Sequence, residues 1–166
     1  MNRKPRLIIH RTVSTNLRMT RNYSADNELR ELDNYYPKSD LNHVYQKNRD
    51  QIINLLNTIE AVWNTSELDN EKFEILYEGL QNSWTAIFYD IIGKEINLMT
   101  GKINGVEKLI YNGIKDSKWR TRFNTVVIMK GFEQKKIKNE IIDLGLSDKS
   151  KKVREMALDV QNHWTD

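Results

Sequence analysis

The sequence contains no cysteine, only three histidines and no apolar run of transmembrane length. Without cysteine, the chain can form neither a disulfide framework nor a thiolate-based zinc site. The N-terminus carries basic residues but lacks the apolar core of a signal peptide, so we expect a cytoplasmic protein with no membrane association. The 166 residues are enough for one domain with its own hydrophobic core.

Motifs that would indicate catalysis are also missing. His10, His43 and His163 lie far apart, and no cluster of histidine and acidic residues has metal-ligand spacing. The serines near predicted helix starts have no G-x-S-x-G or phosphate-binding motif around them. We therefore expect no metal, no cofactor and no catalytic residue, and we predict that the protein is not an enzyme.

Charge is unevenly distributed along the chain. The formal net charge is +3, but residues 1–22 hold six basic residues and no acidic one. Residues 23–83 hold 5 basic and 12 acidic residues, and residues 84–166 hold 15 basic and 11 acidic residues. Such segregation favours surfaces for charged partners. The alternative is that the basic arm folds back onto the acidic middle of the chain.

Apolar periodicity predicts helices over most of the chain. Residues 1–22 lack a helical period, so we expect a basic extended arm followed by a single helical domain, 23–166. A short helix should begin after Ser24, which can cap it, and end before Pro37, because the residue preceding proline avoids helical backbone. A long helix should cover about residues 40–64, where apolar residues recur at spacings of three and four.

A pattern of two aliphatic residues, two variable residues, glycine, an aliphatic residue, a variable residue and Asp or Asn occurs three times. The copies are residues 75–82, 109–116 and 141–148, and their glycines are Gly79, Gly113 and Gly145. The offsets of 34 and 32 residues are typical of stacked helix pairs. The predicted repeat copies are about 40–80, 83–114, 117–146 and the unpaired 149–164.

Residues at the repeat boundaries suit helix ends. We expect the polar residues Asn82, Asp116 and Asp148 to cap the N-termini of the helices that follow them. We expect the three repeated glycines to close the preceding helices, where a residue with left-handed backbone is common. Helix punctuation thus accounts for these glycines without a phosphate-binding loop.

The best preserved copy resembles the HEAT-like repeat family, and consists of Leu146, Asp148, Val153, Arg154 and Ala157. The resemblance covers about residues 70–164 and implies an all-α fold, a HEAT-like α-α superhelix of about seven to eight helices. In such repeats, the Asp and Arg side chains commonly bond between neighbouring units. The resemblance gives this structural inter-repeat role to Asp116, Arg122, Asp148 and Arg154.

Some HEAT-like proteins are alkylpurine DNA glycosylases, which combine a basic concave face, tryptophans and a catalytic Asp. Trp84, Trp119, Asp116 and Arg120 could imitate that set. Both tryptophans recur at a position where a core residue belongs, however, so we expect them to pack in the core rather than to stack on bases. The alternative function is a HEAT-like nucleic-acid-binding protein or glycosylase-like enzyme that uses the basic arm and the basic C-terminal half.

Acidic residues form the more specific surface signal. Four glutamates have spacings of four, three and four, so a helix would place them in one stripe. In HEAT-like solenoids the helix that carries them usually lines the concave face. The predicted partner-binding residues are Glu67, Glu71, Glu74, Glu78, Lys108 and Asn112. A merely solvated face is the alternative.

These observations favour a protein-binding module. More weakly, the chain resembles bacterial toxin-immunity proteins of the contact-dependent inhibition type, as a short stand-alone solenoid rich in Asn, Ile and Lys. That resemblance implies a cognate toxin domain, such as a nuclease, as the partner, and an acidic stripe could occupy its basic cleft. Nucleic acid is the second choice of partner.

Overall fold

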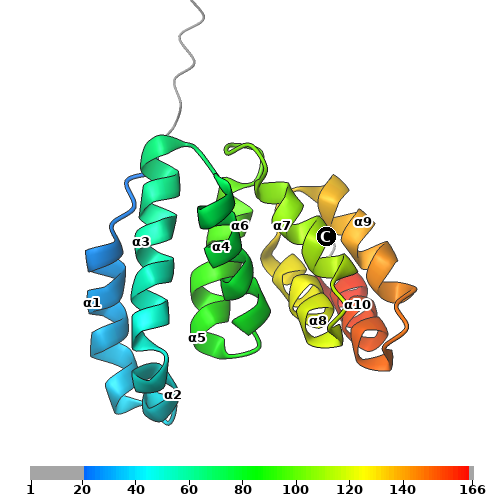
Figure 1. The fold of residues 1–166 in the computed structure, drawn as a ribbon. Coiled ribbons are helices and arrows are strands. Elements are labelled where there is room, and N and C mark those ends of the chain that lie inside the picture. The colour runs from blue at the N-terminus through cyan, green and yellow to red at the C-terminus, as the bar shows by residue number, and fades with distance from the viewer. Residues whose placement is uncertain (1–20, 165–166) are drawn as a thin grey trace, which may run out of the picture.

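The computed structural model describes residues 21–164, and every regular element within them is a helix (Figure 1). The predicted all-α class is therefore confirmed for this part of the chain. The helices are arranged side by side largely in chain order, from α1 at one side of the molecule to α9 and α10 at the other (Figure 1). Of the predicted basic arm, all but the last two residues lie outside the described range.

The first helices differ from the prediction at one point. Ser24 caps α1 (Ala25–Tyr35), because its Oγ accepts a hydrogen bond of 3.3 Å from the backbone N–H of Asn27. The predicted long helix is divided into α2 (Asn42–Lys47) and α3 (Arg49–Thr65). The division falls at Asn48, whose backbone is not helical (φ −107°, ψ 11°). A short 3-10 helix, η1 (Tyr36–Lys38), precedes α2.

Of the seven to eight predicted helices, six fall after residue 65, and the structure has nine elements between residues 66 and 164 because two of the expected helices are subdivided. One has a π-helical middle, η2, and the other ends in a 3-10 turn, η3. The elements are α4 (Asn70–Asn82), α5 (Ala86–Phe88), η2 (Tyr89–Gly93), α6 (Lys94–Met99), α7 (Val106–Lys115), α8 (Trp119–Val127), η3 (Ile128–Gly131), α9 (Lys135–Leu146) and α10 (Lys151–His163).

Contacts between helices link successive parts of the chain. α4 packs on α7, and α7 packs on α9. α8 lies against all three of these helices and against α10, which also packs on α9. At the other side of the molecule, α3 lies between α1 and α4.

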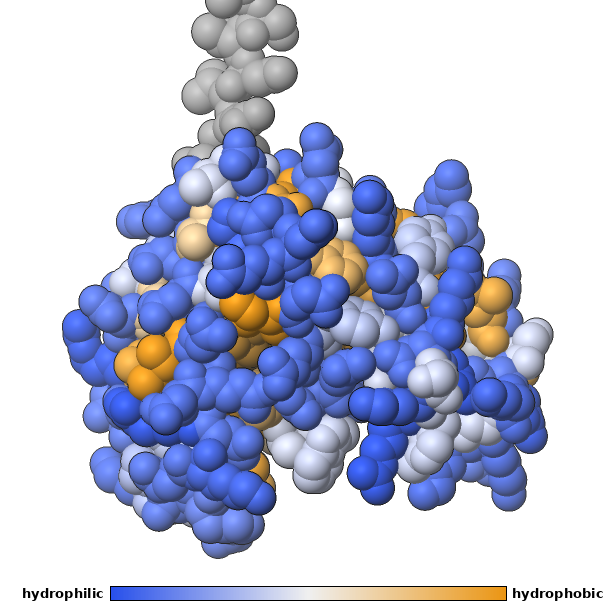
Figure 2. Space-filling view, viewed as in Figure 1, coloured by the Kyte–Doolittle hydropathy of each residue, from blue (hydrophilic) through white to orange (hydrophobic). Residues whose placement is uncertain are grey.

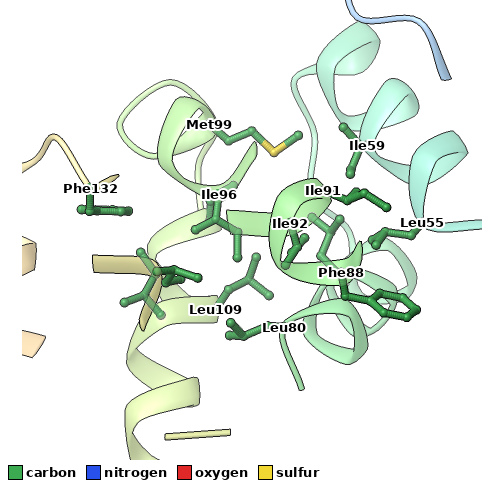
Figure 3. Close-up of a cluster of buried hydrophobic side chains, with 14 of the residues drawn as sticks. Leu55, Ile59, Leu80, Phe88, Ile91, Ile92, Ile96, Met99, Leu109 and Phe132 are labelled. Carbon is green, nitrogen blue, oxygen red and sulfur yellow. The ribbon is translucent and has the colours of Figure 1, made fainter. Parts of the chain in front are cut away.

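Aliphatic side chains from successive elements form one continuous core. Figure 3 shows Leu55 and Ile59 of α3 near Ile91 and Ile92 of η2, with Leu80 of α4 close by. All five side chains are buried. Burial of apolar surface of this kind is the main favourable contribution to folding. The same core continues through α6 and α7 to Phe132 (Figure 3).

The repeated glycines do not close helices, which corrects the prediction. Gly79, Gly113 and Gly145 lie inside α4, α7 and α9, and none has a positive φ. A Cβ atom on Gly113 would lie 2.3 Å from Oγ1 of Thr125 in α8, and one on Gly145 would lie 2.9 Å from Cβ of Ala157 in α10. At these two glycines the neighbouring helix is so close that a side chain would require a shift, whereas a Cβ on Gly79 would lie 3.1 Å from a methyl group of Leu55.

The predicted N-caps are also displaced. Asn82 is the last residue of α4 rather than the cap of the next helix. Asp116 accepts a hydrogen bond of 2.7 Å from the backbone N–H of Lys118, and Asp148 accepts one of the same length from Ser150. These two N–H groups belong to the residues that directly precede α8 and α10, so both aspartates order the turn before a helix without capping the helix itself.

A buried carboxylate anchors the start of the described chain. Glu95 of α6 accepts a hydrogen bond of 2.8 Å from Nε1 of Trp63 in α3 and pairs with Arg21. Glu95 and the ring of Trp63 are both buried.

No helix within residues 21–164 is both long and apolar enough to cross a membrane.

Candidate functional site

An open pocket of about 550 Å³ lies between α8, α10 and the turn that joins α4 to α5. We call it the tryptophan pocket. Its lining residues are Trp84, Trp119, Arg120, Phe123, Asn124, Lys152, Glu155, Met156 and Asp159. Trp84 comes from the turn, the next four residues come from α8, and the last four come from α10.

Helical spacing explains how α8 and α10 supply this lining. Trp119 and Phe123 are four residues apart, as are Lys152 and Met156, so each pair lies on one side of its helix. Asn124 positions the turn that carries Trp84. Its Nδ2 donates hydrogen bonds of 3.1 and 3.0 Å to the carbonyl oxygens of Leu80 and Gln81, and so ties α8 to the end of α4 just before Trp84.

The tryptophans are exposed, which corrects the prediction that they pack in the core. Trp84 is 65% exposed and Trp119 is 36% exposed. The repeat position suggested burial, but Trp84 lies in a turn, and Trp119 stands in the first turn of α8 beside the pocket. The ring of Trp119 meets that of Phe123 edge to face, with centroids 6.2 Å apart.

Two cations lie over the ring of Trp119. Nζ of Lys152 is 4.8 Å from the ring centroid, and Cζ of Arg120 is 5.7 Å from it. Both distances are within the range of cation–π attraction. Neither side chain has a carboxylate within ion-pair distance among residues 21–164.

The two acids of the pocket, in contrast, are already paired. Asp159 lies 3.1 Å from Nζ of Lys130 and 3.2 Å from Nδ1 of His163. The hydrogen bond from Lys130 lowers the pKa of Asp159 below its ordinary value. Glu155 lies 3.4 Å from Nζ of Lys151. The pocket therefore offers apolar ring surface beside two cations that have no ion-pair partner among residues 21–164.

The structure does not bring Asp116 to this pocket. Its Oδ2 accepts hydrogen bonds of 2.6 Å from the hydroxyl of Tyr77 and 3.3 Å from Nε2 of Gln81, both on α4. Burial raises the pKa of Asp116, but the hydrogen bonds from Tyr77, Lys118 and Gln81 outweigh burial and lower it on balance. The set considered for a glycosylase is thus divided, because two tryptophans and Arg120 line the pocket without this carboxylate.

The residues predicted to fasten the repeats make the following contacts. Arg122 of α8 donates hydrogen bonds of 2.6 and 3.0 Å to the two carboxylate oxygens of Asp148. It also donates to the carbonyl oxygens of Asp116 and Ser117. Arg154 repeats only one of these contacts, a hydrogen bond of 2.6 Å to the carbonyl oxygen of Asp148, and its side chain is exposed.

The predicted acidic stripe is shorter than expected. Glu71, Glu74 and Glu78 are exposed on α4, but Glu67 precedes the helix, so its inclusion in a helical stripe was wrong. Glu78 accepts a hydrogen bond of 2.8 Å from Nε2 of Gln51 on α3. The other two predicted partner-binding residues, Lys108 and Asn112, are exposed on α7, the neighbour of α4. Their binding role remains a prediction.

Sequence reasoning missed the part of the site that α10 supplies. Lys152 and Met156, a cation and an apolar residue, are four residues apart. They lie 33 residues after Trp119 and Phe123, which have the same spacing. This agreement in register could have indicated one shared surface.

Among residues 21–164, no group of three metal-ligating side chains is close enough to hold an ion. The chain matches no family model, no curated protein and no solved structure.

Proposed function

We propose that the chain is a HEAT-like α-solenoid that binds another protein through the tryptophan pocket and catalyses no reaction. The contacts α4 to α7 to α9, with α8 and α10 packed beside them, support a stack of helix pairs. The repeated close approaches at Gly113 and Gly145 support it too, because equivalent glycines meet equivalent helices. Solenoids of this kind present rigid grooves to their partners.

The exposure of Trp84 carries the proposal. A tryptophan side chain that is 65% exposed beside a second, partly exposed tryptophan leaves considerable apolar surface in water. Trp, Met and Arg are the residue types enriched in protein interfaces, and Trp and Arg dominate their binding energy. All three types line this pocket.

A second hollow extends the surface beyond the pocket. It has a volume of about 270 Å³ and is lined in part by His43 and Lys47 of α2 and by Thr85. Trp84 lines both hollows, so it stands at the centre of a surface that reaches from α2 to α10. Central, well-packed positions are where binding energy concentrates in interfaces.

The biological role we propose is that of a cytoplasmic immunity protein, which binds a cognate bacterial toxin, a nuclease, and covers its active site. The exposed glutamates of α4 support a basic partner, since complementary charge accelerates encounter and sets specificity. The partner would be encoded beside this protein. A toxin coding sequence in the adjacent gene is the first observation to seek.

Co-expression tests this role. The neighbouring toxin domain should arrest growth when expressed alone, and the intact chain should restore growth. Trp84→Ala should abolish the rescue, whereas Lys136→Ala, an exposed residue of α9 outside both hollows, should retain it. Rescue that survives Trp84→Ala would remove the pocket from the proposal, and absence of rescue by the intact chain would remove the immunity role.

Nucleic-acid binding is the second candidate, favoured by Arg120 and Lys152 beside two tryptophans. Exposed aromatic rings can stack on bases while cations contact phosphates. A filter-binding titration with single-stranded and duplex DNA distinguishes this candidate. The logarithm of the affinity for DNA should fall linearly with the logarithm of salt concentration, and lack of retention at low salt would exclude this candidate.

A further inference from the structure

We propose that the tryptophan pocket takes an aromatic side chain that is accompanied by a carboxylate, as in a partner segment where Phe, Tyr or Trp adjoins Asp, Glu or the chain terminus. This inference rests on the proposed protein-binding function and names the chemistry of the segment.

The shape and lining of the pocket favour a ring. Its volume of about 550 Å³ is within the range of roughly 300–1,000 Å³ typical of ligand sites. Its apolar lining residues are Trp84, Trp119, Phe123 and Met156. Aromatic rings pack well against other rings in offset or edge-to-face geometry, and methionine sulfur also contacts rings favourably.

The charges favour an anion next to that ring. Lys152 and Arg120 have no carboxylate partner among the described residues, whereas Asp159 and Glu155 are each held by cations. An incoming carboxylate would therefore meet unpaired donors and displace no existing ion pair. Charge-assisted hydrogen bonds from Lys and Arg to carboxylates are among the stronger polar contacts in proteins.

A cationic ligand fits less well. The ring of Trp119 already interacts with two cations, at 4.8 and 5.7 Å from its centroid. A third cation would have to displace them or accept their repulsion. An anion can instead bind Lys152 and Arg120 while both stay over the ring, so the cation–π contacts and the new ion pair coexist.

Two small probes of nearly the same size, one anionic and one neutral, test the inference. They are N-acetylphenylalanine, which carries a carboxylate, and N-acetylphenylalaninamide, which does not. Binding to the intact chain is followed by the NMR signals of the indole N–H groups, where the buried Trp63 serves as an internal reference. We expect saturable shifts of Trp84 and Trp119 and an affinity at least about tenfold higher for the carboxylate.

Two charge variants complete the experiment. Lys152→Met and Arg120→Gln should each reduce the preference for the carboxylate, while Lys149→Met, an exposed lysine outside the pocket, should leave it unchanged. Equal or tighter binding of the amide, or no shift of either indole, overturns the inference. So does a short oligothymidylate that shifts the same two indoles when N-acetylphenylalanine does not, since the anion would then be phosphate.

The failure of this inference differs from failure of the proposed function. If the probes do not bind but Trp84→Ala still abolishes toxin neutralisation, the pocket binds a protein segment of other chemistry. If the probes bind as expected but Trp84→Ala leaves neutralisation intact, the pocket has this ligand and the immunity interface lies elsewhere.

Discussion

Arg122 and Asp148 form a buried, bidentate ion pair between α8 and the turn before α10. The side chain of Arg122 is only 5% exposed and that of Asp148 is 7% exposed. Nη1 of Arg122 donates to two carbonyl oxygens in the turn before its own helix. One guanidinium therefore connects the turn before α8 with the turn before α10.

Removal of Arg122 should destabilise the fold strongly. Loss of one partner from a buried ion pair typically costs about 3–5 kcal/mol, because the other charge remains buried without compensation. Arg122→Met should lower the free energy of unfolding by about this amount in urea denaturation. Arg154→Met is the matched control, since this side chain is exposed and makes a single hydrogen bond, to the carbonyl oxygen of Asp148, and should cost under about 0.5 kcal/mol. Equal losses in the two variants would contradict the role of the pair.

The stability that Asp148 contributes should depend on pH. Burial raises its pKa, but the hydrogen bonds from Arg122 and from the backbone of Ser150 outweigh burial and lower it on balance. A carboxyl group with a lowered folded-state pKa stabilises the fold above its unfolded pKa, about 3.9, and this stability is lost as pH falls through the folded-state value. Asp148→Asn should therefore destabilise the protein most at neutral pH.

Urea titrations between neutral and strongly acidic pH measure this dependence. The difference in unfolding free energy between the parent and Asp148→Asn should shrink as pH falls below about 4. Asp143→Asn, at an exposed position of α9, provides the control and should run parallel to the parent. A pH-independent difference for Asp148→Asn would show that its charge is not responsible.

Alanine at Gly113 should be destabilising because its Cβ would collide with Oγ1 of Thr125 and approach Leu80. Overpacking of a helix contact usually costs about 1–3 kcal/mol. A second substitution, Thr125→Ala, should recover part of the loss by removing the clashing hydroxyl. Gly131→Ala is the control, because nothing lies within 4 Å of its Cβ position and its φ is not positive. Thermal unfolding of the parent and these three variants distinguishes close helix packing from a general preference for alanine in helices.

Substitution of Glu95 should release the start of the described chain. Glu95→Ala leaves Nε1 of Trp63 without its acceptor, which for a buried group costs about 1–3 kcal/mol. Arg21 loses its partner at the same time. Hydrogen exchange should show faster opening around Tyr23 and the C-terminal turn of α3. Unchanged exchange there would mean that Glu95 does not hold this segment.

The glutamates of α4 provide a separate test of the predicted acidic surface. Glu71→Lys and Glu74→Lys together should slow association with a basic partner, because rim charges act mainly on the association rate. The effect should diminish as salt is added. Stability should change little, since both side chains are exposed. An association rate unaffected at low salt would remove α4 from the binding surface.

Several of the predictions that succeeded concern helix ends, which depend on residues close to one another in the sequence. The cap at Ser24 and the end of α1 before Pro37 depend on residues adjacent in the chain. The break at Asn48 was missed because the apolar spacing continues across it. The exposed face of the molecule in Figure 2 is mostly hydrophilic, as the periodicity of the helices requires.

The candidate site was predicted poorly because its properties are not local. Trp84 and Trp119 occupy repeat positions that suggested burial, yet the pocket between α8 and α10 leaves both exposed. The periodicity of one helix shows which residues share a side, but not whether a neighbour covers that side. Likewise, the pairing of Asp159 with Lys130 depends on how α10 meets η3.

The amino-acid sequence by itself determined the helical class, the period of about 32 to 34 residues and the positions where glycine recurs. Only the tertiary structure decided why those glycines are needed, which ring surfaces face water and which cations lack a partner. The reason is physical: helix formation follows from contacts three and four residues apart, whereas exposure and charge pairing follow from the approach of helices that are distant in sequence.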